Sequence, residues 1–432
     1  MAQDDFGFGG FGFDPEGLSN IPLFRELGKL MSWQGGPVNW DLAKQMAAGI
    51  AGEPQLAIGV DADQAAWADA VRVTEMWLDA HTTLEAVDGP ALALTAQEWV
   101  ARAADQGGIA RYVEPIATGM QEAMGKGLAD QLPGGMGGLE GLAGAMTPIT
   151  AMLTGMQVGT IAGHLAGQLM GSYDLGVPTL APEVVATVGD SAARLARDHG
   201  LSADEVRFWL ALRECVHRRV FAGVDWLMGH LTSEMGRFAG AMDVDPSALA
   251  ERMGGLGGLT PDLLSDPEAL QRLAEEAGGG MEPSEEQRAI LARLQALVSL
   301  VAGYADVMVR RAGAGKLTNL ARIEEVTVRR RGEQGPGEQF LAQLIGLDLR
   351  PSDVRAGEAF CEAVLAARGP NGLDVIWRDA AHLPTPAEIA EPSRWLIRLA
   401  AEEAETGVAP ALDDLPPADV EIPDDLGGLD GA

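Results

Sequence analysis

The sequence predicts a mainly α-helical protein with long packed helices, Gly-rich insertions and disordered termini, for three reasons. Hydrophobic residues fill 47% of the 432 positions, enough for a large core, yet Phe, Tyr and other strand formers are sparse. Apolar residues recur at helical spacing over long stretches. Residues that favour helix N-caps precede several of these stretches. A chain of this length has room for two or three lobes.

Three segments divide the chain: a Phe- and Gly-rich arm with a first turn at 1–29, a helical body at 30–400 and an acidic tail at 401–432. In the arm, "FGFGGFGFDPE" separates four Phe by glycines, so we expect no regular element there. The arm either docks its rings onto a groove or is a disordered tail. From Glu402 onward there are ten acidic residues, four prolines and no basic residue, which is typical of a solvated, disordered segment.

The first part of the body is predicted to be helical with one interruption. Asn39 follows a Gly-Gly-Pro turn and is expected to cap a helix that begins near Trp40. Helical patterns continue over 61–88 and 94–125, the first carrying apolar residues at Ala66, Val73, Trp77 and Leu84. Residues 126–146 are rich in Gly and Met and are expected to form a mobile insertion.

A stripe of small residues follows this insertion. Glycines recur every four positions, at Gly155, Gly159, Gly163, Gly167 and Gly171. No Asp, Glu, Lys or Arg lies between Glu140 and Asp174, so length alone permits a membrane span. The favoured prediction is a buried helix whose bare face lets another helix approach closely. Each interior Gly costs roughly 0.5–1 kcal/mol against Ala, so close packing must compensate.

The second part of the body is also predicted to be helical. After an extended connection at 173–185, Ser202 and Glu205 form a capping-box pattern at the start of a helix over 202–222. Further helices are expected at 224–243, 284–311, 317–331 and 336–346, followed by shorter helices and Pro-containing loops over 351–391. The helix at 284–311 has an apolar seam formed by Ile290, Leu294, Leu297, Val301, Tyr304 and Met308.

Charge and cysteine content exclude several classes of function. The net charge is −32 and no domain-sized stretch is basic, which argues against binding to nucleic acid or anionic lipid. Cys215 and Cys361 are far apart and neither is part of a Cys-x-x-Cys pair, so thiol chemistry and a zinc knuckle are not indicated. Without a signal-peptide pattern, we expect a reducing cytoplasmic location.

The stretch "ALRECVHRRVF" at 211–221 is close to a zinc-binding helix. In His-Glu-x-x-His, two imidazoles one turn apart bind zinc and the Glu is the general base. Here Glu214 and His217 keep two of the three positions, but Arg213 replaces the first His. A single His on a helix is more often structural than a ligand. This helix is strongly apolar around the polar residues, however, so they should be buried and need partners.

An ordered series of stretches resembles a known family: the type 2 zincin-like metallopeptidases, actinobacterial zinc-dependent metalloproteases or hydrolases related to proteins associated with deazaflavin-cofactor biosynthesis. The resemblance covers most of the chain. It implies a zincin-like helical fold and zinc-dependent hydrolysis, with a degraded His-Glu-x-x-His motif. It rests on "LMSWQGGPVNWDLA" (30–43), "GQLMGSYDLGVP" (167–178), "FWLALRECVHRRVFAGVDWL" (208–227), "LVSLVAGYADVMVRRA" (297–312), "IEEVTVRRRGEQGPGEQFLAQLIGLDLRP" (323–351) and "AFCEAVLAARGPNGLDVIWRDAAHLPTP" (359–386).

The resemblance also implies a candidate zinc site with two ligand positions replaced. Glu214 is the vestigial general base, and His217 and Asp306 are candidate metal ligands. Arg213 stands at the first imidazole, and Ala302 stands where active members carry a carboxylate. A guanidinium about 5 Å from a dication costs roughly 6–7 kcal/mol at an effective dielectric constant near 20, so zinc binding should be weak or absent.

Arg213 has a second interpretation as an internal cation. It pairs with a carboxylate such as Asp306 or Glu214, while His217 donates to a carbonyl or carboxylate, and a metal-free polar cluster then joins two helices. His164 and His230 are more often structural than replacement ligands. Neither a phosphate-binding loop nor a Gly-x-Ser-x-Gly nucleophile motif is indicated.

Three functions are consistent with these patterns. The first is a zinc-dependent metalloprotease or hydrolase with weak or no activity. The second is a non-catalytic pseudoenzyme that binds or scaffolds an unknown protein or peptide. The third, a membrane-associated helical protein, depends only on the glycine stripe and is the least favoured.

Overall fold

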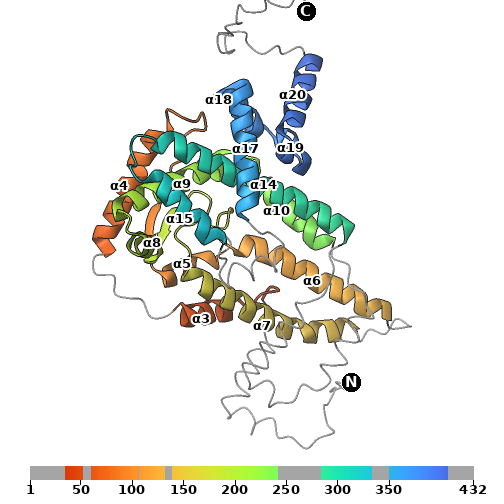
Figure 1. Ribbon diagram of the computed structural model, residues 1–432. Helices are drawn as coiled ribbons and strands as arrows, with labels where there is room; N and C mark the ends of the chain where they lie inside the picture. The colour runs from red at the N-terminus through yellow and green to blue at the C-terminus, as the bar shows by residue number, and fades with distance from the viewer. Residues whose placement is uncertain are drawn as a thin grey trace, which may run out of the picture.

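The computed structural model describes residues 35–51, 60–105, 107–131, 139–241, 284–332 and 350–406, and it is mainly α-helical as predicted (Figure 1). Its elements are α3 (Trp40–Ile50), α4 (Val60–Leu78), β1 (Ala91–Leu94), α5 (Ala96–Ala103), α6 (Ala110–Gln131), α7 (Leu139–Ala166), β2 (Val185–Val188), α8 (Ser191–His199), α9 (Ala203–Gly223), α10 (Leu227–Gly240), α14 (Glu285–Gly313), α15 (Leu320–Gly332), α17 (Pro351–Arg368), α18 (Pro370–Asp374), η1 (Val375–Trp377), η2 (Ala380–His382), α19 (Pro386–Ala390) and α20 (Pro392–Thr406).

Several predicted segments lie outside the described residues. These are the arm at 1–29, the acidic tail beyond Thr406 and the helix expected at 336–346. Within the insertion expected at 126–146, α6 extends to Gln131 and α7 begins at Leu139, so both of its flanks are helical. The mobility expected for this insertion and the three-segment division of the chain stay predictions.

The two long helical patterns in the first part of the body are shorter or divided in the structure. The first, α4, ends at Leu78 rather than near position 88. The second is divided into β1, α5 and α6. Thr95 caps α5 through a reciprocal capping box with Glu98, and the chain turns again at Gly108, where a Cβ would lie 2.3 Å from the carbonyl oxygen of Ala103. Apolar periodicity alone does not reveal these breaks because both sides of each break are apolar.

A small parallel sheet lies within the helical body. Strands β1 and β2 pair in register from Ala91 opposite Val185 to Leu94 opposite Val188. The segment before β2 is also attached to this sheet, since Val188 N–H donates to the carbonyl of Met170 at 2.9 Å. The sheet thereby fixes residues 170–174, which face helix α9.

Three glycines of the stripe, Gly155, Gly159 and Gly163, form the contact surface between α7 and α3, which lie side by side in Figure 1. Gly167 and Gly171 lie beyond the end of α7. A Cβ at Gly155 would lie 2.5 Å from the carbonyl oxygen of Asn39, and one at Gly159 would lie 2.6 Å from that of Ala43. Gly163 faces Ile50 in the same way. The prediction of a helix with a bare face is therefore confirmed, and close approach of α3 is the reason for the glycines.

The membrane reading of the stripe finds no support in the described helices. Among them, only α14 has the length and apolar composition of a membrane span, and 72% of its most apolar window is buried inside the protein. Helix α14 crosses α17 at two glycines: a Cβ at Gly303 would lie 2.2 Å from Glu358 N, and one at Gly357 would lie 2.0 Å from the Ser299 carbonyl oxygen. Its apolar surface is thus used for packing between helices.

Among the described helices, α9 carries the most buried charged side chains. Ser202 caps its start by accepting from Glu205 N–H, as expected, but Glu205 does not complete a capping box. Its carboxylate accepts from Thr318 N–H and Asn319 instead, at 2.7 and 2.6 Å. A capping box is a local pattern, and here a loop distant in sequence provides better donors.

Carboxylates in and directly after α4 neutralise the charges of two arginines of α9. Arg218 and Arg219 are almost fully buried, and each forms a 2.6 Å ion pair with Glu75. Arg219 also contacts Asp79 at 2.7 Å. A buried charge needs such partners because it has lost its hydration. These contacts attach α9 to α4 one turn beyond the candidate site.

Replacing Gly159 by Ala is expected to destabilise the protein by about 1–3 kcal/mol, because the new methyl group would push α3 away from α7. The matched control is Gly236→Ala in α10, where no atom lies within 4 Å of the added Cβ. That change should stabilise the protein by about 0.5–1 kcal/mol through helix propensity. Urea unfolding of both variants measures the difference; equal effects would contradict the role assigned to the stripe.

Candidate functional site

Helix α9 places the three residues of the Arg-Glu-x-x-His motif in the interior. Arg213 is 1% exposed, and Glu214 and His217 are both 0% exposed. They face two structures: helix α14, which carries Ala302 and Asp306, and the segment 170–174 attached to β2. The polar cluster expected from the sequence is therefore real, and it joins three elements rather than two.

Arg213 is held by two carboxylates. Its Nη1 donates to Asp174 Oδ1 at 3.3 Å, and its Nε lies 4.0 Å from Asp306 Oδ1. The other oxygen of Asp174 accepts from the backbone N–H groups of Met170 and Gly171, at 2.5 and 3.3 Å. The pairing with Asp306 was expected. Asp174 was missed, although it is the first charged residue after the uncharged run and could have been suspected for that reason.

Glu214 does not pair with Arg213 but faces the neighbouring backbone. Its carboxylate accepts from Ser172 N–H at 2.9 Å, from the Ser172 hydroxyl, and from Tyr173 N–H at 3.2 Å. A Cβ at Gly171 would lie 2.3 Å from Glu214 Oε1, so only glycine fits there. The last glycine of the stripe thus makes space for this carboxylate, a role that the helical spacing did not predict.

Burial controls the ionisation of Glu214. Loss of hydration raises the pKa of this carboxyl to about 7, and the nearby negative charge of Asp174 adds to the rise. The Ser172 and Tyr173 donors and the Arg213 guanidinium act in the opposite direction but do not outweigh burial. Near neutral pH the group is therefore divided between its protonated and ionised forms.

A hydrogen bond and stacking on Tyr173 hold His217 among the described residues. Its Nδ1 lies 2.8 Å from the carbonyl oxygen of Arg213; because a carbonyl only accepts, Nδ1 carries the proton. The imidazole stacks on Tyr173 with ring centroids 5.3 Å apart, and Tyr173 stacks on Phe221 at 5.9 Å. The expected donation from His217 to a carbonyl is confirmed, with the acceptor in its own helix.

Helix α14 contributes little metal-binding chemistry at this point. Ala302 is fully buried and has no donor atom. It lies one turn before Asp306 and hence on the same face of the helix. Asp306 is also near Glu324, whose pKa is raised mainly by burial and further by Asp306. A carboxylate is therefore available only at Asp306, where Arg213 already provides a positive charge.

The two other histidines considered from the sequence lie elsewhere. His164 is exposed on α7 and does not reach the interior of α9. His230 lies in α10 beside Trp226, with ring centroids 5.8 Å apart, and burial lowers its pKa. Among the described residues, neither histidine forms a hydrogen bond or an ion pair with the Arg213 cluster.

The residues present do not fit a zinc ion. Zinc needs three or four deprotonated N, O or S donors around one point. Across the described ranges, no group of three or more His, Cys, Asp or Glu residues has such an arrangement. At the position of the first ligand Arg213 is a permanent cation, and both oxygens of Glu214 are used by donors from residues 172 and 173. The donor set instead suits a guanidinium.

Replacing Arg213 by Leu should cost about 3–5 kcal/mol of unfolding free energy, because Asp174 and Asp306 would keep buried or half-buried charges without the guanidinium. Arg207→Leu, on the second turn of α9, is the matched control. Arg207 pairs with the exposed Asp204, so its loss should cost less than about 1 kcal/mol. Similar urea midpoints for the two variants would contradict the central role of Arg213.

Glu214→Gln should change how stability depends on pH. Because the pKa of Glu214 is about 7 in the folded protein and 4.5 in a free side chain, the native state binds more protons between these values. The wild type should therefore lose about 3 kcal/mol relative to the Gln variant as pH rises from 4.5 to 7. Urea unfolding of both proteins at pH 5 and pH 8 measures this, and a stability difference independent of pH would refute it.

Comparisons with known proteins agree with the fold and with the family expected from the sequence. A family model described as zincin-like metallopeptidase matches residues 38–396. A solved structure from Chloroflexus aurantiacus, described as a candidate hydrolase with a novel fold, is similar at a TM-score of 0.58 and 22% identity; the match covers 84% of this chain and 99% of that one. At this identity the likeness concerns the fold alone. A search of curated proteins gave no match. Since the family model spans most of the sequence, the chain belongs to the zincin-like metallopeptidase family.

Proposed function

We propose that this family member has weak or no zinc-peptidase activity and acts as a protein-binding or scaffolding module. One observation carries the proposal: the Arg213 guanidinium occupies the first ligand position and is paired with Asp174 and Asp306. A metal ion there would have to displace a cation from two carboxylates and then bear its repulsion.

The position of Glu214 supports the same proposal. A general base in a zinc hydrolase must reach the water bound to the metal. Glu214 directs its carboxylate to the backbone of residues 172 and 173, and it is fully buried. In this arrangement the carboxylate stabilises the segment beside β2, which is a structural role.

The proposed partner is a protein or peptide, and the proposed location is the cytoplasm. A net charge of −32 disfavours polyanions such as nucleic acid. Both cysteines are free and buried, which agrees with a reducing compartment. The competing candidate is a zinc-dependent hydrolase, which is favoured by the family and by the retained Glu214 and His217.

Metal analysis separates the two candidates. After dialysis against zinc and then against metal-free buffer, the wild-type chain is expected to retain well under one zinc per molecule. Hydrolysis of a mixed peptide library with added zinc should be the same for wild type and Glu214→Gln. Near one zinc per chain, together with activity that is lost in Glu214→Gln, would establish the hydrolase instead.

A gain of binding provides the complementary measurement. Arg213→His removes the guanidinium and restores the first imidazole, and Ala302→Glu restores the carboxylate of α14. The double variant should bind zinc at least ten-fold more tightly than the wild type. The matched control combines Ala302→Glu with Arg207→His, which adds the same groups but leaves Arg213 in place. Equal zinc affinity of the two double variants would show that Arg213 does not control metal binding.

A further inference from the structure

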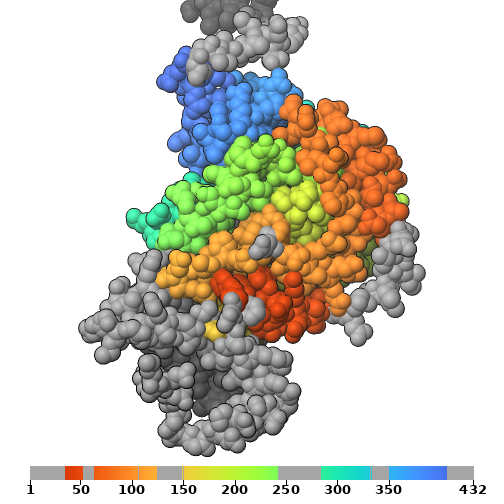
Figure 2. All heavy atoms as spheres, turned by 180° about the vertical axis from the view of Figure 1, so that it is seen from behind, coloured from red at the N-terminus to blue at the C-terminus, as the bar shows by residue number. Residues whose placement is uncertain are grey.

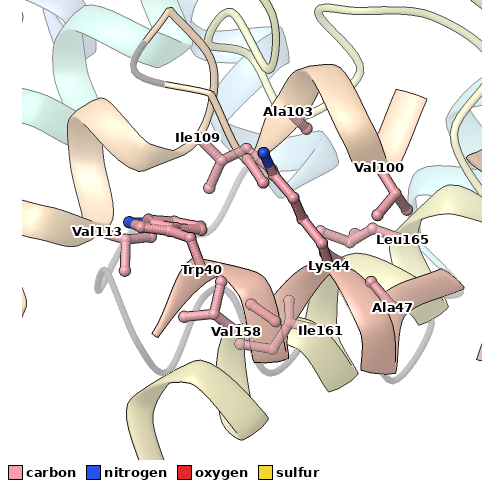
Figure 3. Close-up of a pocket in the computed structure, with 13 residues that line it drawn as sticks. Trp40, Lys44, Ala47, Val100, Ala103, Ile109, Val113, Val158, Ile161 and Leu165 are labelled. Atoms are coloured by element: carbon pink, nitrogen blue, oxygen red, sulfur yellow. The ribbon is translucent and has the colours of Figure 1, made fainter. Parts of the chain in front are cut away.

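An apolar groove lies between α3, α5, α6 and α7, on the side of α7 that carries α3 (Figure 3). Its walls are aliphatic side chains, with Trp40 at one side and the stem of Lys44 crossing it. It encloses, together with its mouth, about 430 Å³. In Figure 2, α3 is seen in red beside the orange surface of α5 and α6. The groove is remote from the Arg213 cluster in sequence and in the elements that form it.

Among the residues that line the groove, only Lys44 and Trp40 have side chains that form hydrogen bonds, and these bonds lie at its edge. Lys44 Nζ pairs with Asp105 at 3.1 Å, and Trp40 Nε1 donates to Glu114 at 2.8 Å. The other lining residues are Ala, Val, Ile and Leu. Water in such a groove finds few hydrogen-bond partners, so an apolar group with an acidic neighbour suits it better.

We propose that this groove binds a phenyl ring of the Phe-Gly segment at residues 6–13 of the same chain. The first argument is composition. The chain has ten Phe, four of which lie in this segment, and the residues between them are glycines, which have no side chain to cover a ring. Phe rings provide a large apolar area, and burying one against aliphatic side chains is favourable.

The second argument is connectivity. The described chain starts at Gly35, five residues before Trp40, which itself lines the groove. From Phe13 to Gly35 the chain advances 22 positions, which can span about 70 Å when extended. The segment therefore reaches the groove easily, and the tether gives it an effective concentration on the order of millimolar. Even weak affinity for a single ring then leads to occupancy.

Charge is the third argument. Asp14 and Glu16 directly follow Phe13, so a docked ring brings a carboxylate to the rim where Lys44 lies. The present partner of Lys44 is the exposed Asp105, and such a surface pair is weak enough to exchange. In a chain of net charge −32, a lysine at the mouth of an apolar groove selects for an acidic aromatic segment.

The open mouth of the groove decides where a ring would lie. The volume of about 430 Å³ belongs largely to the open mouth of the groove, so a ring would lie against the aliphatic lining at the mouth rather than inside a closed cavity. We expect the four phenylalanines to be alternatives for this one lining, and a variant must remove all of them to empty it.

The test uses a fluorescent peptide with the sequence of residues 3–17 and two full-length proteins. One is the wild type, and the other carries Phe6→Ser, Phe8→Ser, Phe11→Ser and Phe13→Ser. If the segment fills the groove, the four-Ser protein should bind the peptide at least ten-fold more tightly than the wild type, whose groove is occupied. A peptide with Ser in place of Phe should bind neither. Equal peptide affinities of the two proteins would overturn the proposal.

A second pair of variants locates the site. Adding Lys44→Glu to the four-Ser protein should weaken peptide binding at least five-fold, whereas Arg72→Glu, an exposed charge reversal on α4, should not. Both are surface changes that leave the core intact. Equal loss in both variants would place the peptide elsewhere. A photo-reactive Phe analogue at position 11 should cross-link to α3 or α7 within one chain; cross-links between chains would show that a second copy is the occupant.

Discussion

The buried guanidinium of Arg213 is the interaction on which the centre of the structure depends. A cation that has lost its water must be compensated by negative charge, and here the compensation comes from two directions. Asp174 belongs to the segment attached to β2, and Asp306 belongs to α14. The same charge therefore joins the sheet, α9 and α14, which are far apart in sequence. Zinc ligation at positions 213, 217, 302 or 306 would have joined only α9 and α14.

The surroundings are adapted to a guanidinium rather than a metal ion. Asp174 uses its second oxygen for the N–H groups of Met170 and Gly171, which orients it towards Arg213. Glu214 accepts from the N–H groups of Ser172 and Tyr173, and it needs a glycine at position 171 for space. The carboxylates of Asp174 and Glu214 thus accept from consecutive N–H groups of residues 170–173. Only Asp174 faces the Arg213 guanidinium. The segment 170–174 is therefore as important for this site as the helix that carries the motif.

Glycine serves two separate purposes along the same stripe. At Gly155 and Gly159 it lets the backbone of α3 come close, and at Gly171 it admits a side chain from α9. Helical spacing identified the stripe and its packing role. It did not separate Gly171 from the others, because that distinction depends on α7 ending at Ala166 and the chain turning towards β2. The groove between α3, α5, α6 and α7 lies beside this contact.

The sequence by itself determined the helical class, the family, the burial of α9 and the need of Arg213 for a carboxylate, because periodicity and desolvation act over a few turns of one helix. Tertiary structure alone decided that Asp174 is the nearer partner, that Glu214 faces Ser172 and Tyr173, and that Glu205 binds the loop before α15. Each of these contacts joins residues about 40 to 110 positions apart. Their geometry depends on where loops end and strands pair, which no local pattern records.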